Sequence, residues 1–169
     1  MLVEWVLTLP LLLLLLVGLV DAAQLVLLHA QVDNLTREAG NLASRGLTLD
    51  QTWDTMRQQD APLDLEAEGQ VIITVITRRN PNGNAGGDDE PWIQDQRTFG
   101  GKSWIASDVG SPGGAARVPA GCTTDCITSL PTGIVMVAVE TAYTYRPLIP
   151  PPRFTELVYP DFVNDRAYF

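Results

Sequence analysis

The N-terminal stretch decides the fold of this chain, and residues 3–46 read "VEWVLTLPLLLLLLVGLVDAAQLVLLHAQVDNLTREAGNLASRG". The run 5–20 is apolar apart from Thr8 and spans about 24 Å as a helix, somewhat less than the roughly 30 Å of a bilayer core. Apolar character resumes after Asp21 and continues to Ala30. The segment is therefore long enough to insert into a membrane as one helix.

A lone acid, Glu4, stands at the head of this run, and no basic residue accompanies it. A cleaved secretory signal is disfavoured, because it needs a positive N-terminal region and an apolar core that stops at small residues. An uncleaved single-pass anchor fits better. Glu4 and Asp21 lie about 26 Å apart along a helix, near opposite membrane faces. A carboxylate in that position usually has a partner, although one that only touches the headgroup layer needs none.

Beyond the apolar run, apolar side chains recur at steps of three and four, which is typical of a heptad seam on a helix. Its members are Leu25, Leu28, Val32, Leu35, Ala39 and Leu42. We therefore expect one helix from near residue 2 to about Arg45, about 65 Å long, with Gly46 as its C-cap. The seam can pack on neighbouring helices or on the chain's own globular part, and both can hold at different heights.

The rest of the chain predicts a small α+β domain over residues 47–169, separate from the N-terminal membrane and assembly helix 1–46. Thr48 and Gln51 form a capping-box pattern that starts a short helix to about Gln58. Runs of β-branched and aromatic residues then predict an antiparallel sheet. The expected strands are 69–79, a short one at 102–109 around Trp104, the strongest at 133–146, and a final one at 154–159.

Charge and cysteine content exclude several classes of protein. The net charge of −9 and pI near 4.4 argue against binding nucleic acid and against peripheral binding to anionic lipid. Cys122 and Cys126 lack two further zinc ligands, because the only histidine, His29, lies far away in the N-terminal segment. If the domain lies outside the cytoplasm, a small-loop disulfide is the better interpretation, and a pair of buried thiols is the alternative.

Patterns for catalysis or ion binding are weak. The loop around Asn80, Asn82 and Asn84 copies part of a calcium-loop spacing, but Ala85 and Pro91 occupy positions that such a loop needs for other residues. A solvated hairpin loop is the expected structure there. Neither a nucleophile with a base nor a phosphate loop is present, since "GGKS" at 100–103 lacks the upstream glycine. We expect no enzymatic activity, no cofactor, no metal and no small-molecule substrate.

The N-terminal segment as a whole resembles the TadE-like family of the tight-adherence (Tad) pilus system. The similar features are Val3-Glu4, Pro10, the leucine run 11–16, Arg37-Glu38-Ala39-Gly40, and Leu42-Ala43. Near the other end, "VMVAVETAYTYRPLIP" is similar to the closing strand of that family, with Tyr145-Arg146-Pro147-Leu148 its most specific part. The resemblance covers roughly residues 1–46 and 133–150.

The resemblance implies a role for Glu4. In pilin-like proteins a prepilin peptidase cuts before the apolar segment, and the acid then pairs with the new N-terminal amine of a neighbouring subunit. The given sequence is expected to begin at or near the mature end, although the family places this Glu at the fifth mature position and here it is fourth. In a low-dielectric environment such a pair fixes the register between helices.

The function implied is that of a minor pilin or pseudopilin. It would be held in the inner membrane with its domain in the periplasm, and then assembled with other pilin-like subunits into a surface filament for adherence and biofilm formation. Assembly contacts are expected from Glu4 and from the seam. The alternative is a single-pass anchored ectodomain that binds a ligand or an envelope partner and never enters a filament.

The cysteine pattern gives the first testable prediction. Mass spectrometry of unreduced peptides from exported protein should show Cys122 linked to Cys126, because oxidising compartments favour a bond across a short loop. Free thiols that can be alkylated in the exported protein would contradict this.

Overall fold

The computed structural model describes residues 2–59, 63–79, 90–117, 136–147 and 161–169, with only the backbone given for residues 2–7. It confirms the α+β class. Three helices and four strands follow in chain order: α1 Leu2–Ser44, α2 Leu49–Gln59, α3 Leu65–Glu68, β1 Gly69–Arg79, β2 Glu90–Phe99, β3 Met136–Thr144 and β4 Phe162–Tyr168.

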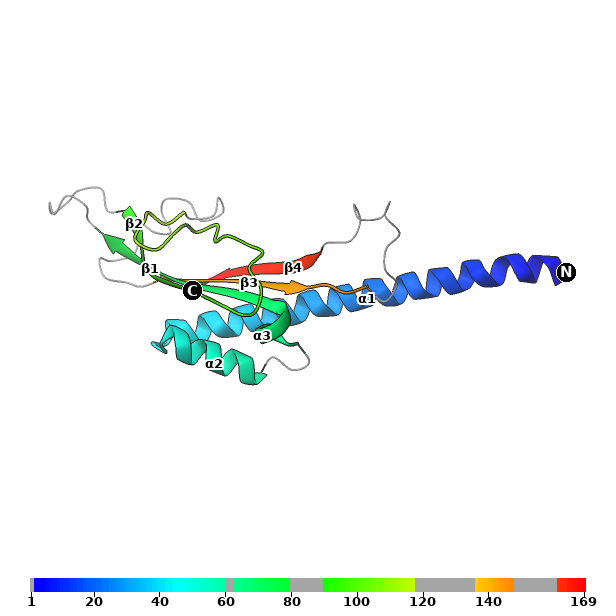
Figure 1. Cartoon of the computed structure of the whole chain (residues 1–169), viewed down its shortest axis with the longest axis horizontal. Coiled ribbons are helices and arrows are strands. Elements are labelled where there is room, and N and C mark those ends of the chain that lie inside the picture. Colours follow the sequence, from blue (N-terminus) through cyan, green and yellow to red (C-terminus); the bar gives the residue numbers. More distant parts are fainter. Residues whose placement is uncertain (1, 60–62, 80–89, 118–135, 148–160) are drawn as a thin grey trace.

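Helix α1 extends from the N-terminal end of the molecule to the domain, and only its second half lies beside the sheet (Figure 1). The expected single helix is confirmed, and it continues through Pro10. It ends where Gly46 takes a φ of 93° and its N–H donates to the carbonyl of Ala43. That positive φ favours glycine and ends the helix.

The sheet has the order β2-β1-β3-β4, with each neighbouring pair antiparallel. Strand β1 is central, and Ile73 lies opposite Val139 of β3 and Arg97 of β2. Because the first part of β1 is covered on both faces, its first six residues are all buried, as its continuous β-branched run predicts, and burial decreases towards Arg79. The strands predicted at 69–79 and 133–146 correspond to β1 and to the described part around β3.

One face of the sheet packs against α1 and α2. The seam residues Val32, Leu35 and Ala39 are almost completely buried there, in one cluster with Ile73 and Val139. Each such side chain contributes about 1.5–3 kcal/mol on burial. Nearby, the ring of Phe169 occupies the place that a side chain at position 40 would need, so a larger residue than Gly40 would displace this ring.

Helix α2 begins with the predicted capping box. The Thr48 N–H donates to Gln51 Oε1 at 3.1 Å, and the Gln51 N–H donates to Thr48 Oγ1 at 3.2 Å. The apolar side of the helix buries Leu49 and Met56. Trp53 stacks on Phe99 at 5.3 Å between ring centroids, which fixes α2 against the end of β2.

The other face of the sheet is crossed by residues 100–117, which we call the strap. Its Val109 is fully buried against Ile76 and Ile93. Strap residues 113–116 also bond along the outer edge of β2, where Ile93 N–H donates to the Gly114 carbonyl at 3.0 Å. The polar and glycine-rich strap therefore contributes to the hydrophobic cluster on this face of the sheet.

The strand predicted at 102–109 is wrong, since this part of the strap has no strand pairing. The side chain of Gln70 replaces a ladder. Its Oε1 accepts from the N–H groups of Trp104 and Ile105 at 2.6 and 2.9 Å, and its Nε2 donates to the Ile105 carbonyl at 2.8 Å. Because these backbone groups are satisfied, the segment packs on the sheet without joining it.

The second strand is instead β2, whose sequence "EPWIQDQRTF" is mostly polar. It was missed because an edge strand with a half-exposed face needs few apolar residues. The strand predicted at 154–159 lies outside the described residues, and the last strand that the structure describes is β4. The possible calcium loop at 80–89 also lies outside them.

Gly100 provides a test of how the strap begins. Its φ is 98°, and a Cβ there would collide with the carbonyl oxygen of Gly69, while Gly46 has a similar φ and nothing within 4 Å. Gly46→Ala should lower the free energy of unfolding by about 1 kcal/mol from backbone strain alone. Gly100→Ala should lower it by at least about 3 kcal/mol, because backbone must also move.

Urea unfolding of the detergent-solubilised protein, followed by tryptophan fluorescence, measures both values. Equal losses in the two variants would show that the collision with Gly69 is not a constraint on the fold.

Candidate functional site at the junction of helix and sheet

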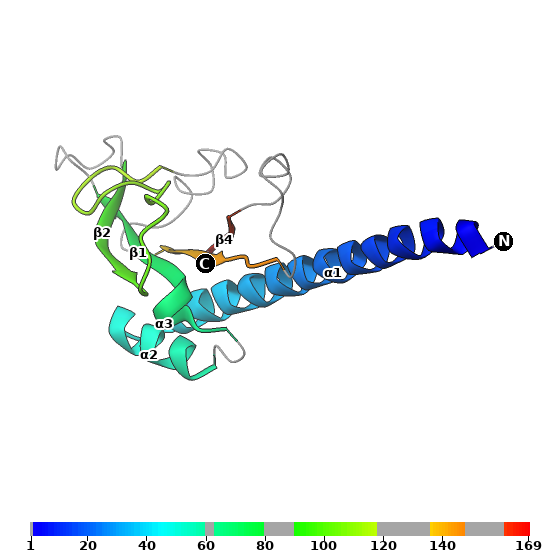
Figure 2. The same ribbon diagram turned by 45° about the vertical axis from the view of Figure 1, so that its right-hand side comes forward.

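The first half of α1 is an apolar surface that the rest of the described chain leaves uncovered. Its leucines are exposed by 55–73 %: Leu9, Leu11, Leu12, Leu13, Leu14, Leu15, Leu16 and Leu19. By length and composition the described part of the chain holds one helix able to cross a membrane, within Thr8–Ser44, with a peak mean hydropathy of 2.6. Only 6 % of that apolar window is buried, so it is not the core helix of a soluble domain. Figure 2 shows it projecting beyond the domain.

Asp21 is the first buried residue among the described side chains of α1, and beyond it one side of the helix is covered while Val26 and Leu27 on another side stay exposed. Asp21 is only 3 % exposed, and its main-chain carbonyl accepts a hydrogen bond from the Tyr145 hydroxyl at 3.2 Å. Tyr145 follows directly after β3 and is itself 6 % exposed. This contact joins the end of β3 to α1.

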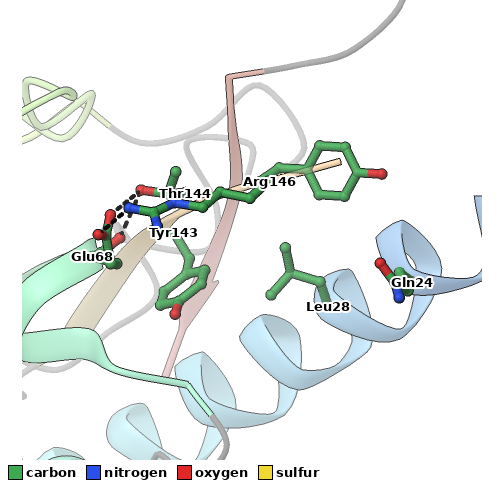
Figure 3. Close-up of a pocket in the computed structure, with 7 residues that line it drawn as sticks. Gln24, Leu28, Glu68, Tyr143, Thr144 and Arg146 are labelled. Carbon is green, nitrogen blue, oxygen red and sulfur yellow. Dashed lines mark hydrogen bonds and ion pairs between the residues drawn. The ribbon is translucent and has the colours of Figure 1, made fainter. Parts of the chain in front are cut away.

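A cleft of about 260 Å³ opens beside this contact (Figure 3). Helix α1 contributes Gln24 and Leu28, and the end of β3 contributes the two tyrosines that flank Thr144. The hydroxyl of Tyr143 accepts a hydrogen bond from the Asp64 N–H at 3.2 Å. This bond holds the start of α3 against the cleft. The cleft therefore lies between the helix, the sheet and α3, immediately beyond the uncovered apolar half.

A charged cluster lines the far side of the cleft. Glu68 pairs with Arg146, accepts from Thr144 Oγ1 at 3.1 Å, and lies 3.7 Å from Lys102 Nζ. The side chain of Arg146 is 74 % exposed and that of Glu68 25 %. Surface ion pairs contribute about 0–1 kcal/mol each, so the cluster matters more for the charges it presents than for stability. It presents two cations and one carboxylate.

A second polar cluster lies under the strap, on the opposite face of the sheet. Glu140 is 2 % exposed and accepts from Ser107 Oγ at 2.5 Å and from the Asp108 N–H at 3.1 Å. Arg166 Nε lies 2.9 Å from Glu140, and Arg166 also pairs with Asp108. Burial alone lowers the pKa of Arg166, but the hydrogen bond to Asp108 and the charge of Glu140 outweigh it and raise that pKa.

This second cluster is structural in its geometry. Burial raises the pKa of the neighbouring Tyr168, although Arg166 opposes the change. Both carboxylate oxygens of Glu140 are used in holding the strap and Arg166. The carboxylate therefore anchors the strap.

The predicted assembly residues fall into three groups. Glu4 lies in the first turn of α1, where only the backbone is described. Leu25, Leu28 and Leu42 are half-buried along the helix. The central seam residues, which are Val32, Leu35 and Ala39, are occupied by the chain's own sheet, the second of the two alternatives for the seam. Cys122 and Cys126 lie outside the described residues.

The junction itself was missed by sequence reasoning. Tyr145 and Arg146 were singled out only as part of a family resemblance, with no role attached, and Glu68 was not singled out at all. Two signals were available in the sequence. One was the acid Asp21 within an apolar helix, and the other was Arg146 at the end of a strongly predicted strand. Neither signal could reveal that β3 ends beside that turn of α1.

One comparison with known proteins gave a match, and it covers most of helix α1. The family model described as TadE-like protein matches residues 1–41, which confirms the resemblance for this segment. The family suggests a Tad pilus component with an N-terminal membrane-type helix. Searches of curated proteins and of solved structures gave no match.

Tyr145→Phe tests the junction. Loss of the hydroxyl leaves the Asp21 carbonyl without this buried donor, so the free energy of unfolding should fall by about 0.5–1.5 kcal/mol. Tyr143→Phe is the matched control, because its partner, the Asp64 N–H, is exposed and can bond to water. Hydrogen exchange at the α1 turn around Asp21 should accelerate only in Tyr145→Phe, and equal exchange in both variants would contradict the role given to Tyr145.

Proposed function

We propose that this TadE-like chain is a non-enzymatic minor pilin or pseudopilin of a Tad-type pilus, held in the inner membrane and then assembled into, or priming, an adhesive filament. The observation that carries the proposal is the division of α1. Its first half is apolar and uncovered, and its second half is the support of the chain's own sheet.

Such a helix suits a subunit that changes its surroundings. Lipid chains and the leucine side chains of neighbouring helices are about equally apolar, so the same surface can leave the bilayer for a helical bundle at little cost. The domain does not need to refold during this transfer, because its core uses only the second half of α1. One helix thereby serves as an anchor before assembly and as a packing element afterwards.

The division also limits where neighbouring subunits make contact. Val32, Leu35 and Ala39 are occupied by the sheet, so contacts between subunits fall on the first half of α1 and on the half-buried Leu25 and Leu28. The partners are other pilin-like subunits, after processing by a prepilin peptidase.

Glu4 is the residue proposed to set the register between subunits. A carboxylate within an apolar bundle is costly when unpaired, so it favours the one alignment that brings an amine beside it. The N-terminal amine of a neighbour, released by the peptidase, would supply this charge. The other candidate, an anchored ectodomain that binds an envelope partner, gives Glu4 no such task.

Glu4→Ala should leave insertion and folding unchanged and reduce incorporation into sheared pili by at least about tenfold, because the ion pair that fixes the register is lost. Immunoblots of membranes and of purified filaments measure both quantities. Asp54→Ala, an exposed acid on α2, is the matched control. Unchanged incorporation of Glu4→Ala would remove the main mechanical support for the proposal.

The same samples should be sequenced at their N-terminus by mass spectrometry, with and without the prepilin peptidase. A peptidase-dependent end near Met1 is expected. An identical, unprocessed end in both strains would favour the fixed anchor and the alternative function.

A further inference from the structure

With the first half of α1 in a membrane, as proposed above, the cleft in Figure 3 has a defined height relative to that membrane. From Glu4 to Asp21 the helix rises about 26 Å, somewhat less than the roughly 30 Å of a hydrocarbon core. Asp21, to which Tyr145 bonds, therefore lies at the boundary of that core. Gln24 and Leu28 lie about 5–10 Å further along the helix, which is the depth of the lipid headgroups.

The side chains of the cleft suit that depth. Two tyrosines, Tyr143 and Tyr145, line it, and tyrosine is enriched where membrane meets water. Arg146 extends along the cleft with most of its side chain exposed. Each of these features is common by itself. Here the hydrogen bond from Tyr145 to Asp21 fixes the cleft at one height along α1, beside the uncovered apolar half of the helix.

The charges of the cleft are arranged as a complementary pair. Arg146 uses Nη2 to contact Glu68, and a guanidinium carries five N–H donors that match a phosphate. Glu68 is an acceptor for N–H groups, and Lys102 lies on its other side at 3.7 Å. Arg146 and Glu68 are in contact with each other, and a ligand that carries a phosphate and an ammonium group can bridge such a pair by placing each of its charges on the opposite one.

We propose that this cleft binds the headgroup of an aminophospholipid, with its phosphodiester on Arg146 and its primary ammonium on Glu68. The acyl chains then lie along the uncovered leucines of α1. Glu68 and Arg146 can separate slightly without leaving either charge unpaired. Glu68 keeps Lys102 as a partner, and Arg146 gains the phosphate of the lipid.

The ligand is zwitterionic for two reasons. The chain carries a net charge of −9, which repels anionic headgroups. A choline headgroup has no N–H to donate to Glu68, so it loses the hydrogen bond that a primary ammonium makes. The proposal rests on the membrane-anchoring part of the proposed function and is independent of filament assembly.

The test uses the full chain in lipid nanodiscs that contain equal amounts of phosphatidylethanolamine, phosphatidylcholine and phosphatidylglycerol. After mild detergent extraction, retained lipid is measured by mass spectrometry. Phosphatidylethanolamine should be enriched about tenfold over the other two lipids, and Glu68→Gln and Arg146→Gln should each abolish the enrichment. Arg57→Gln is the matched control, because Arg57 forms an exposed pair with Glu66 at 3.3 Å elsewhere on the domain.

A second measurement needs no variant. With the wild-type chain, retention should fall stepwise as the ethanolamine nitrogen is methylated once, twice and three times, because N–H donors are lost. Equal retention across this series, or equal enrichment in Arg146→Gln and Arg57→Gln, would overturn the proposal. Binding of soluble glycerophosphoethanolamine by lipid-free protein would also overturn it, because the ligand would then come from the aqueous phase. Failure of the chain to enter nanodiscs would instead refute membrane anchoring, which filament assays do not measure.

Discussion

The packing of the second half of α1 against the sheet is the contact on which the rest of the structure depends. Val32, Leu35 and Ala39 form one cluster with residues of β1 and β3, and this cluster fixes the helix to one apolar face of the sheet. Because the cluster involves only the second half, the first half projects free of the domain. A single continuous helix therefore joins two environments without a hinge, and the position of the domain is set by where the packing begins.

The start of that packing is marked by polar groups. Tyr145 donates to the carbonyl of Asp21, and Arg146 pairs with Glu68 directly beyond it. A buried hydroxyl needs a partner, so its bond restricts which turn of the helix the strand can approach. Apolar contacts have no directional preference, so they restrict the height of the sheet along the helix less than a hydrogen bond does. The polar contacts therefore specify height, while the apolar contacts supply most of the stability.

On the opposite face of the sheet, polar contacts also fix the position of a segment, the strap. Gln70 and Glu140 are buried polar side chains in the centre of the sheet. Gln70 bonds to the backbone of the strap, and Glu140 bonds to the Asp108 N–H, the Ser107 hydroxyl and Arg166. They hold an irregular, glycine-rich segment where a helix or a further strand would otherwise cover the face. Buried polar groups with complete partners specify one arrangement of such a segment, because any other arrangement leaves them without partners. This face consequently differs in character from the helix-covered face.

The sequence by itself determined the elements whose signals are local. The apolar run and the seam determined α1, the Thr48 and Gln51 pair determined where α2 begins, and the β-branched runs determined β1 and the region of β3. Only the tertiary structure decided which polar stretch became an edge strand, that the strap lies flat on the sheet, and that Tyr145 meets Asp21. Those outcomes depend on contacts between residues far apart in the chain, such as the Gln70 side chain bonding to the backbone at 104–105. The free energy of such contacts is absent from any short window of sequence, because it arises only when the partners are brought together.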